Sequence, residues 1–207
     1  MDKCFEILLG EKEDDEQKKQ SEEKEAGADA LSAKFLKTRQ IILSGEINKE
    51  LAEQIARQLL ILEADSDEPI RLFIDSPGGD ADAGYAIFDM IRFINAPVYT
   101  IGMGLIASAA SIVLLAAPKE RRYGLPNSRY LIHQPMSGMQ GVTTEIEIHA
   151  QELEKMRMKI NQMIAEETGK KAEDVAKDTD RDYWLDAAEA KAYGLISNIC
   201  KSRKDIA

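Results

Sequence analysis

Cysteine and histidine are scarce in this chain, which has two of each among its 207 residues. Cys4 and Cys200 are too few for a disulfide framework, and they lack the spacing of metal ligands. We therefore expect two reduced thiols, as in a reducing compartment, and no metal site. The shortage of histidine also restricts the choice of any imidazole base to His133 or His149.

Long apolar runs and an excess of basic residues are also missing. No segment reaches the ~20 consecutive apolar residues that span a bilayer, and residues 1–10 lack the basic start and long apolar stretch of a secretory signal. The formal net charge is −10, which provides no basic field for nucleic acid or anionic lipid. We expect a cytoplasmic protein with no nucleic-acid or membrane partner.

The negative charge gathers near the N-terminus. Residues 1–30 contain eleven acidic residues and five lysines, so they carry −6, and the remaining 177 residues carry only −4. Residues 11–25 contain no apolar residue, and such a stretch cannot bury enough surface to offset the entropy of ordering it. The predicted organisation is a charged, flexible segment over residues 1–33, one folded domain over residues 34–200 and a short tail over residues 201–207.

Short β-rich runs alternate with amphipathic helical patterns through the body of the chain. Strands are predicted over residues 39–43, 70–74, 98–103 and 129–133, and helices over residues 49–62, 81–94, 107–117 and 144–168. Asn48 is a predicted helix N-cap and Gly169 a predicted C-cap. This alternation predicts an α/β fold with a mainly parallel sheet.

Ser108 lies between a predicted strand and a predicted apolar helix, beside Ala107 and Ala109. The N-terminus of a helix offers free backbone N–H groups and a positive potential, which suit a developing oxyanion. The small neighbours also let a substrate backbone approach closely. On local sequence alone, however, an ordinary helix N-cap is the more common role for such a serine.

His133 ends a predicted strand, at the edge of the sheet where α/β proteins place their sites. The alternative is a hydrogen-bonded structural histidine. The second histidine, His149, lies on the long helix among Glu145, Glu147 and Glu152, which favours a solvated or ion-paired role. His133 is therefore the stronger candidate for a catalytic base.

Two glycines follow the second predicted strand, in the turn Ser76-Pro77-Gly78-Gly79. Glycine permits unusual φ values and leaves the backbone N–H groups uncovered, which suits an oxyanion hole and a strand-like grip on an extended peptide. A tight strand–helix turn is the alternative. The absence of G-x-x-x-x-G-K-[ST] and of G-x-G-x-x-G argues against a phosphate-binding loop.

Taken in order, these motifs closely resemble the ClpP proteolytic subunits of the Clp protease family. The matching motifs are Ser-Pro-Gly-Gly (76–79), Gly-x-x-Ala-Ser (104–108), Leu-Pro-Asn-Ser-Arg (125–129), Ile-His-Gln-Pro (132–135), Glu-Ile-His-Ala (147–150), Asp-Thr-Asp-Arg-Asp (178–182), Glu-Ala (189–190) and Tyr-Gly-Leu (193–195). The likeness runs from Phe35 to Cys200 without an evident gap. Serine-to-histidine and histidine-to-aspartate separations of 25 and 49 residues also match the family.

The resemblance implies a serine endopeptidase with a Ser-His-Asp triad. Ser108 corresponds to the nucleophile, His133 to the general base and Asp182 to the carboxylate that orients the imidazole. Backbone N–H groups of Gly79 and Ala109 correspond to the oxyanion hole, although the family has a bulky methionine in place of Ala109. The implied fold is a stack of ββα units of the ClpP/crotonase type, and the protruding handle helix corresponds to residues 144–168.

The resemblance also implies partners. Handle helices join two seven-membered rings of identical subunits, and Asp180 and Arg181 match positions that pair across the rings. A hexameric AAA+ unfoldase supplies unfolded polypeptides and uses ATP, so this chain needs no cofactor. The unfoldase docks in an apolar pocket that corresponds to Phe73, Phe93, Ile101, Met103, Tyr123 and Leu125. Arg71 stands where the family usually has an aromatic residue, and Cys200 where it has an aliphatic one.

Three alternatives stay open on sequence. A non-catalytic or regulatory ring subunit fits the divergent N-terminal segment and Arg71, but such members lose triad residues and all three are present here. A crotonase-type acyl-CoA enzyme shares the architecture, but it does not need the three together, and the chain has no basic cluster for the CoA phosphates. A Ser–Lys peptidase fits poorly because Lys119 lies near the far end of the predicted helix from Ser108.

Overall fold

The computed structural model describes residue 32 and residues 34–206. The charged segment predicted over residues 1–33 therefore lies outside the described residues, except for residue 32. The chain divides into two units, residues 1–39 and residues 40–207. In the first unit residues 34–36 are helical, and the backbone N–H of Thr38 donates to the carbonyl of Phe35. All elements described below belong to the second unit.

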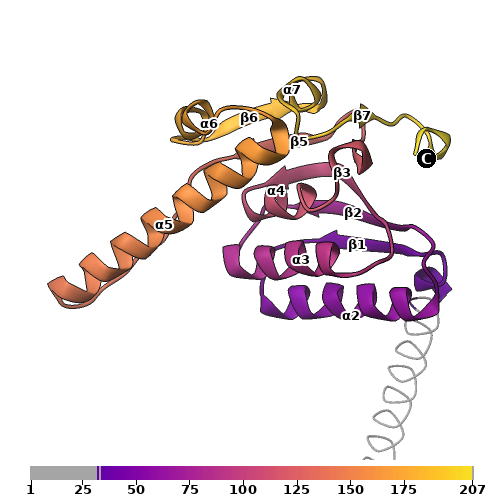
Figure 1. Ribbon diagram of the computed structural model, residues 1–207, viewed down its shortest axis with the longest axis horizontal. Coiled ribbons are helices and arrows are strands. Elements are labelled where there is room, and N and C mark those ends of the chain that lie inside the picture. Colours follow the sequence, from indigo (N-terminus) through magenta and orange to yellow (C-terminus); the bar gives the residue numbers. More distant parts are fainter. Residues whose placement is uncertain (1–31, 33, 207) are drawn as a thin grey trace, which may run out of the picture. The chain divides into compact units, whose positions relative to one another are not determined.

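Strand–helix repeats form the centre of the second unit (Figure 1). The pairs are β1 (Gln40–Ser44) with α2 (Lys49–Asp65), β2 (Ile70–Ser76) with α3 (Ala81–Phe93), and β3 (Val98–Ala107) with α4 (Ala109–Leu114). The three strands pair in parallel, α2 packs against α3, and α3 packs against α4. Their inward apolar side chains form the core, and the predicted α/β fold of stacked units is confirmed.

Four shorter strands extend this sheet. They are β4 (Arg122–Gly124), β5 (Arg129–Ile132), β6 (Tyr183–Asp186) and β7 (Asn198–Ile199). β4 pairs in parallel with the first half of β3 and with β7, and β5 pairs in parallel with the second half of β3. β6 pairs with β5 in antiparallel fashion. Two more helices, α6 (Ala172–Asp178) and α7 (Ala187–Tyr193), flank β6 along the chain.

The third strand is longer and the helix after it shorter than the sequence predicts. A strand was expected over residues 98–103 and a helix over residues 107–117, whereas β3 covers Val98–Ala107 and α4 only Ala109–Leu114. The cause is a bulge, because residues 103–105 separate the β2-paired positions Gly102 and Ile106. Beyond the bulge β3 continues because it pairs with β5, a long-range contact that local sequence does not encode.

Both predicted helix caps are present. The side chain of Asn48 accepts a hydrogen bond of 2.8 Å from the backbone N–H of Leu51 at the start of α2. Gly169 follows α5 (Thr143–Thr168) with a φ of 77°, in the left-handed region that favours glycine. The long helix predicted over residues 144–168 is confirmed to within one residue.

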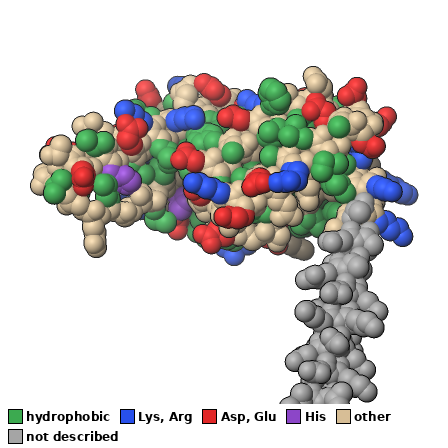
Figure 2. Space-filling view, turned by 90° about the horizontal axis from the view of Figure 1, so that it is seen from below, with side chains coloured by type: hydrophobic (Ala, Val, Ile, Leu, Met, Phe, Trp, Pro, Cys, Tyr) green, Lys and Arg blue, Asp and Glu red, His purple; other side chains and the backbone are tan. Residues whose placement is uncertain are grey.

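Only the C-terminal part of α5 is buried. All its buried residues lie at Ile160 or beyond, and its first part projects away from the sheet (Figure 1). Figure 2 shows hydrophobic side chains on the surface of this projecting end. The buried guanidinium of Arg122 holds the base of the helix, because it donates to the carbonyl of Ala117 and to the carbonyl and carboxylate of Glu167. Among the described residues, no helix has the length and apolar character needed to cross a membrane.

Candidate active site

Ser108 occupies the junction of β3 and α4 in a conformation that residues other than glycine rarely adopt. Its φ is 54° and its ψ is −121°, and such a conformation costs about 1–3 kcal/mol and persists only where its surroundings impose it. Here β5 imposes it: the Ser108 N–H donates to the carbonyl of Leu131 at 2.9 Å, and the Ser111 hydroxyl donates to the same carbonyl at 3.1 Å. The Ser108 side chain does not cap α4, so the ordinary N-cap interpretation is wrong.

The glycine turn after β2 lies directly against this junction. A Cβ added to Gly78 would lie 2.7 Å from the Cβ of Ser108 and 2.6 Å from the carbonyl oxygen of Ala107. Gly78 also has a φ of 95°. Close approach and positive φ together require glycine at this position, so the turn and the serine are fixed relative to each other.

The backbone N–H of Gly79 points away from the segment around Ile47, with which Gly79 is paired. The N–H of Ile47 donates to the carbonyl of Gly78, and the N–H of Asp80 donates to the carbonyl of Ile47, each at 2.8 Å. This pattern makes a parallel bridge between Ile47 and Gly79, in which the N–H of Gly79 itself faces the opposite side. Gly79 and Ala109 both line the same cavity as Ser108.

His133 and Asp182 face each other where β5 ends and β6 begins. The antiparallel register pairs Ile132 with Tyr183. His133 follows Ile132 and Asp182 precedes Tyr183, so these two residues lie opposite each other. The Nδ1 atom of His133 lies 3.0 Å from the Oδ1 atom of Asp182. When Nδ1–H donates to this carboxylate, Nε2 is left as a proton acceptor.

Further hydrogen bonds tie the chain after His133 to the loop before Asp182. The N–H of Gln134 donates to the carbonyl of Thr179 at 2.6 Å, and its side-chain amide donates to the carbonyl of Asp180 at 2.6 Å. The hydroxyl of Thr179 donates to the side chain of Asn161 on α5 at 2.7 Å. Asp180 and Arg181 are exposed beside this loop, so the ring–ring contact predicted for them stays a prediction.

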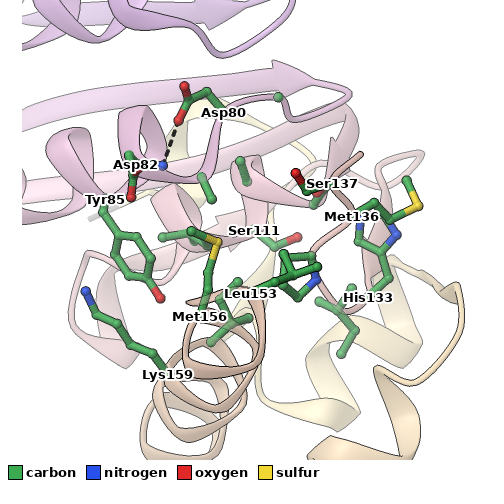
Figure 3. A pocket seen from close by; sticks show the side chains of 18 of the residues that line it. Asp80, Asp82, Tyr85, Ser111, His133, Met136, Ser137, Leu153, Met156 and Lys159 are labelled. Carbon is green, nitrogen blue, oxygen red and sulfur yellow. Dashed lines mark hydrogen bonds between the residues drawn. The ribbon is translucent and has the colours of Figure 1, made fainter. Parts of the chain in front are cut away.

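One cavity of about 850 Å³ joins the candidate residues. Ser108, His133, Gly79 and Ala109 line it, whereas Asp182 contacts His133 from outside the lining. The cavity lies between α3 and α4 on one side and α5 on the other, and Figure 3 shows side chains from both sides pointing into it. None of the hydrogen bonds of the described residues joins the Ser108 hydroxyl to the imidazole, a contact that in many hydrolases tightens only with substrate.

The predicted docking residues are only partly brought together. Ile101 and Tyr123 form a buried cluster with Cys200, against which Phe73, Tyr99, Leu125 and Ile206 pack. Burial in this cluster raises the pKa of the Cys200 thiol, which also donates to the carbonyl of Asp205 at 3.7 Å. Phe93 is outside this cluster at the end of α3, 77% exposed, and Met103 lies half-buried in the bulge of β3.

Several residues around the cavity were not predicted from the sequence. Ser111 helps to hold the Ser108 turn. The signal in the sequence was a polar residue inside an otherwise apolar helix. Asp75 accepts a hydrogen bond of 3.0 Å from the N–H of Leu105 and so holds the bulge of β3. Tyr85 and Lys159 line the cavity without any motif that marks them. The described residues contain no group of three or more His, Cys, Asp or Glu side chains placed to bind a metal ion, and Lys119 does not line the cavity.

Comparison with known proteins identifies the family. The model of the Clp protease family matches residues 22–203. The chain belongs to the Clp protease family. The resemblance inferred from the motifs is thereby confirmed, and membership makes this chain a Clp-type peptidase.

Individual members of the Clp protease family match this chain over most of their length. The ATP-dependent Clp protease proteolytic subunit 2 of Treponema denticola is 73% identical over 179 residues, which cover 86% of this chain and 90% of the relative. The protein of the same name from Treponema pallidum is 64% identical over 183 residues, covering 88% and 92%. The solved structure of a point mutant of ClpP1 from Listeria monocytogenes has 48% identity and a TM-score of 0.81, and the match covers 86% of this chain and 99% of that one.

Proposed function

We propose that this chain is a serine endopeptidase, the proteolytic subunit of an ATP-dependent Clp protease, and that it hydrolyses peptide bonds in unfolded polypeptides. The observation that carries the proposal is the convergence of Ser108 and His133 on one cavity, with His133 Nδ1 3.0 Å from Asp182. Two relatives with more than 60% identity are named as proteolytic subunits of ATP-dependent proteases, which supports the same assignment.

The proposed chemistry is acyl transfer through Ser108. His133 Nε2 takes the hydroxyl proton as Ser108 Oγ attacks the peptide carbonyl, and Asp182 stabilises the imidazolium that forms. His133 then protonates the leaving amine, which departs and leaves an acyl-enzyme. A water molecule, deprotonated by His133, attacks the ester, and the acid product leaves as Ser108 recovers its proton.

The tetrahedral oxyanion formed in both steps would accept hydrogen bonds from the N–H groups of Gly79 and Ala109. Each such donor is typically worth ~10²–10³ in rate. The support for this role is that both residues line the cavity, with the N–H of Gly79 turned away from Ile47. Because the donors are backbone atoms, a side chain as small as Ala109 serves as well as a larger one.

The proposed assembly is a double ring of two stacked heptamers that works with a hexameric AAA+ unfoldase in the cytoplasm. Exposed apolar side chains on the projecting part of α5, such as Ile146 and Ile148, support burial against other copies, and Asp180 with Arg181 would pair across the rings. The apolar cluster of Ile101 and Tyr123 would receive the unfoldase. ATP is consumed by the unfoldase, so the chain itself uses no cofactor.

The test is covalent labelling of the purified, assembled protein with a fluorophosphonate probe, with the adduct located by peptide mass spectrometry. We expect labelling at Ser108 that disappears in His133→Ala. The matched control is Ser137→Ala, because Ser137 lines the same cavity but is hydrogen-bonded to His149 at 2.9 Å, and labelling should persist there. Absence of labelling in a confirmed double ring would overturn the peptidase assignment in favour of a regulatory ring subunit.

A further inference from the structure

The two faces of β2 differ in burial. Leu72 and Ile74 are fully buried, whereas Arg71 and Phe73, which alternate with them along the strand, are only half-buried. Because successive side chains of a strand point to opposite faces of the sheet, Arg71 and Phe73 share the less buried face. On that face a charged side chain therefore lies next to an apolar one.

Arg71 lies at the margin of the apolar cluster around Ile101 and Tyr123, which we call the docking surface. Tyr99, which packs against that cluster, is the partner of Arg71 in the register between β2 and β3, and Phe73, which also packs there, is the next residue on the same face. Covering a charge with apolar surface alone is unfavourable. A partner that covers the docking surface closely must therefore supply a polar or charged group for Arg71.

The guanidinium of Arg71 has no hydrogen-bond partner among the described residues. Its Nε atom is buried, but its two terminal nitrogens are not among the buried atoms that lack a partner, so they keep accessible surface. A carboxylate pairs with such terminal nitrogens through two parallel hydrogen bonds. An incoming carboxylate can therefore reach Arg71 end-on, although it cannot reach Nε.

Two further arginines lie beside the strand neighbours of Arg71. Arg203 donates to the side chain of Gln40 at 3.2 Å, and Gln40 is the β1 partner of Arg71. The guanidinium of Arg121 lies 5.8 Å from the centroid of the Tyr99 ring. None of the three arginines forms an ion pair with a carboxylate in the part of the chain that the structure describes. In a chain with a net charge of −10, they make this margin a local positive surface.

Two carboxylates of the same region have other partners. Asp205 accepts hydrogen bonds from the N–H groups of Lys201 and Ser202, each at 2.8 Å. Asp75, farther along the same face of β2, accepts a hydrogen bond of 3.0 Å from the N–H of Leu105. The positive surface is therefore left for a carboxylate that a partner brings.

We propose that Arg71 makes the docking surface selective for an unfoldase loop that carries a glutamate or aspartate beside its apolar anchor. The inference rests on the proposed function, in which the unfoldase occupies this surface. The anchor packs against Ile101 and Tyr123 while the carboxylate accepts hydrogen bonds from the terminal nitrogens of Arg71. Arg121 and Arg203 add attraction at longer range, which salt screens.

The experiment measures the binding of fluorescein-labelled peptides to the assembled Ser108→Ala protein by fluorescence polarisation. The peptides share a leucine–phenylalanine anchor and differ only in the residue after it, which is glutamate, glutamine or lysine. We expect Kd to be about tenfold lower for the glutamate peptide than for the glutamine peptide, the value of one charge-assisted pair of hydrogen bonds, and highest for the lysine peptide. Added salt should narrow these differences.

Substitutions of Arg71 assign the preference to one side chain. In Arg71→Gln the advantage of glutamate over glutamine should fall to about twofold, because only the longer-range attraction is left. Arg71→Glu should reverse the order of the glutamate and lysine peptides. The matched control is Arg57→Gln on α2, which removes an exposed arginine paired with Glu53 and should keep the tenfold preference.

Three outcomes overturn the inference: equal binding of the glutamate and glutamine peptides, no saturable binding of any peptide, or a glutamate preference that survives Arg71→Gln. The peptidase assignment is tested separately, by labelling of Ser108 in the unsubstituted protein. If labelling is absent while the preference that depends on Arg71 is measured, the peptidase proposal fails and the docking selectivity stands. Labelling of Ser108 together with equal peptide binding has the opposite meaning.

Discussion

The two sides of the cavity come from regions of opposite character. Ser108 and the glycine turn belong to the sheet-centred region of β2, β3, α3 and α4, where most apolar side chains are buried. The facing wall belongs mainly to the projecting region, residues 133–142 and α5 up to Lys159, where Met136 is 81% exposed and Val142 is 65% exposed. Only the base of this wall, at Ile160 and Ile164, is buried. The nucleophile is therefore positioned by the core of its own subunit, whereas most of the wall that would grip substrate is not.

This difference indicates where each half of the site obtains its rigidity. Strain at Ser108 is maintained by buried hydrogen bonds to Leu131, which persist in a single subunit. The apolar surface of the projecting region, including Ile146, Ile148 and Met158, gains stability only when another surface covers it. The sheet-centred half is thus arranged in advance for the proposed chemistry, and the facing half would gain rigidity in the proposed assembly.

The largest expected effect comes from Asp182→Asn, which alters the hydrogen bond between the imidazole and the loop after α6. An amide does not hold His133 in the tautomer with Nδ1–H, so kcat should fall by ~10⁴. Kinetics with a peptide substrate measure this loss, and native gel mobility checks that assembly is retained. A fall of less than ~10-fold would contradict the role of Asp182 in this chemistry.

A pair of glycine substitutions separates the two regions directly. Gly78→Ala places a methyl group 2.6 Å from the Ala107 carbonyl oxygen, so the Ser108 turn must move and kcat should fall by at least ~10². Gly138→Ala, in the projecting region, meets no atom within 4 Å and should leave kcat unchanged. Equal losses in both variants would show that the projecting region is as tightly constrained as the core.

The junction between the regions is probed by Glu167→Gln. This change leaves the buried guanidinium of Arg122 without its carboxylate, and breaking such a buried pair costs about 3 kcal/mol of unfolding free energy. Glu53→Gln is the control, because its ion pair with Arg57 is about 70% exposed and contributes little. Urea denaturation measures both, and a stability loss no larger than that of the control would contradict a clamp at the base of α5.

The smallest effect on an isolated subunit is expected for Ile148→Ala on the projecting part of α5. Ile148 is 56% exposed, so its truncation should change unfolding free energy by less than about 0.5 kcal/mol. The same truncation at the buried Ile87 of α3 should cost about 2–5 kcal/mol. Sedimentation should show the reverse order for assembly, with Ile148→Ala the more disruptive of the two.

The sequence was most informative where structure depends on neighbours in the chain. Helical periodicity and capping residues located α2, α3 and α5, and the position of Ser108 and His133 at strand ends marked them as candidates. Long-range pairing was beyond reach: the two-residue strand β7 and the continuation of β3 exist only through their partners. Asp182 was found only through family resemblance, because its approach to His133 depends on the register between β5 and β6.

The carbonyl of Leu131 has a consequence for how the site could be turned on and off. Ser108 and Ser111 both donate to it, and His133 lies two residues later, directly after the end of β5. The hydrogen bond to Leu131 therefore couples the Ser108 turn to the end of β5 that carries His133, while Asp182 supports His133 separately. A movement of β5 along β3 would thus displace the nucleophile and the base in the same step.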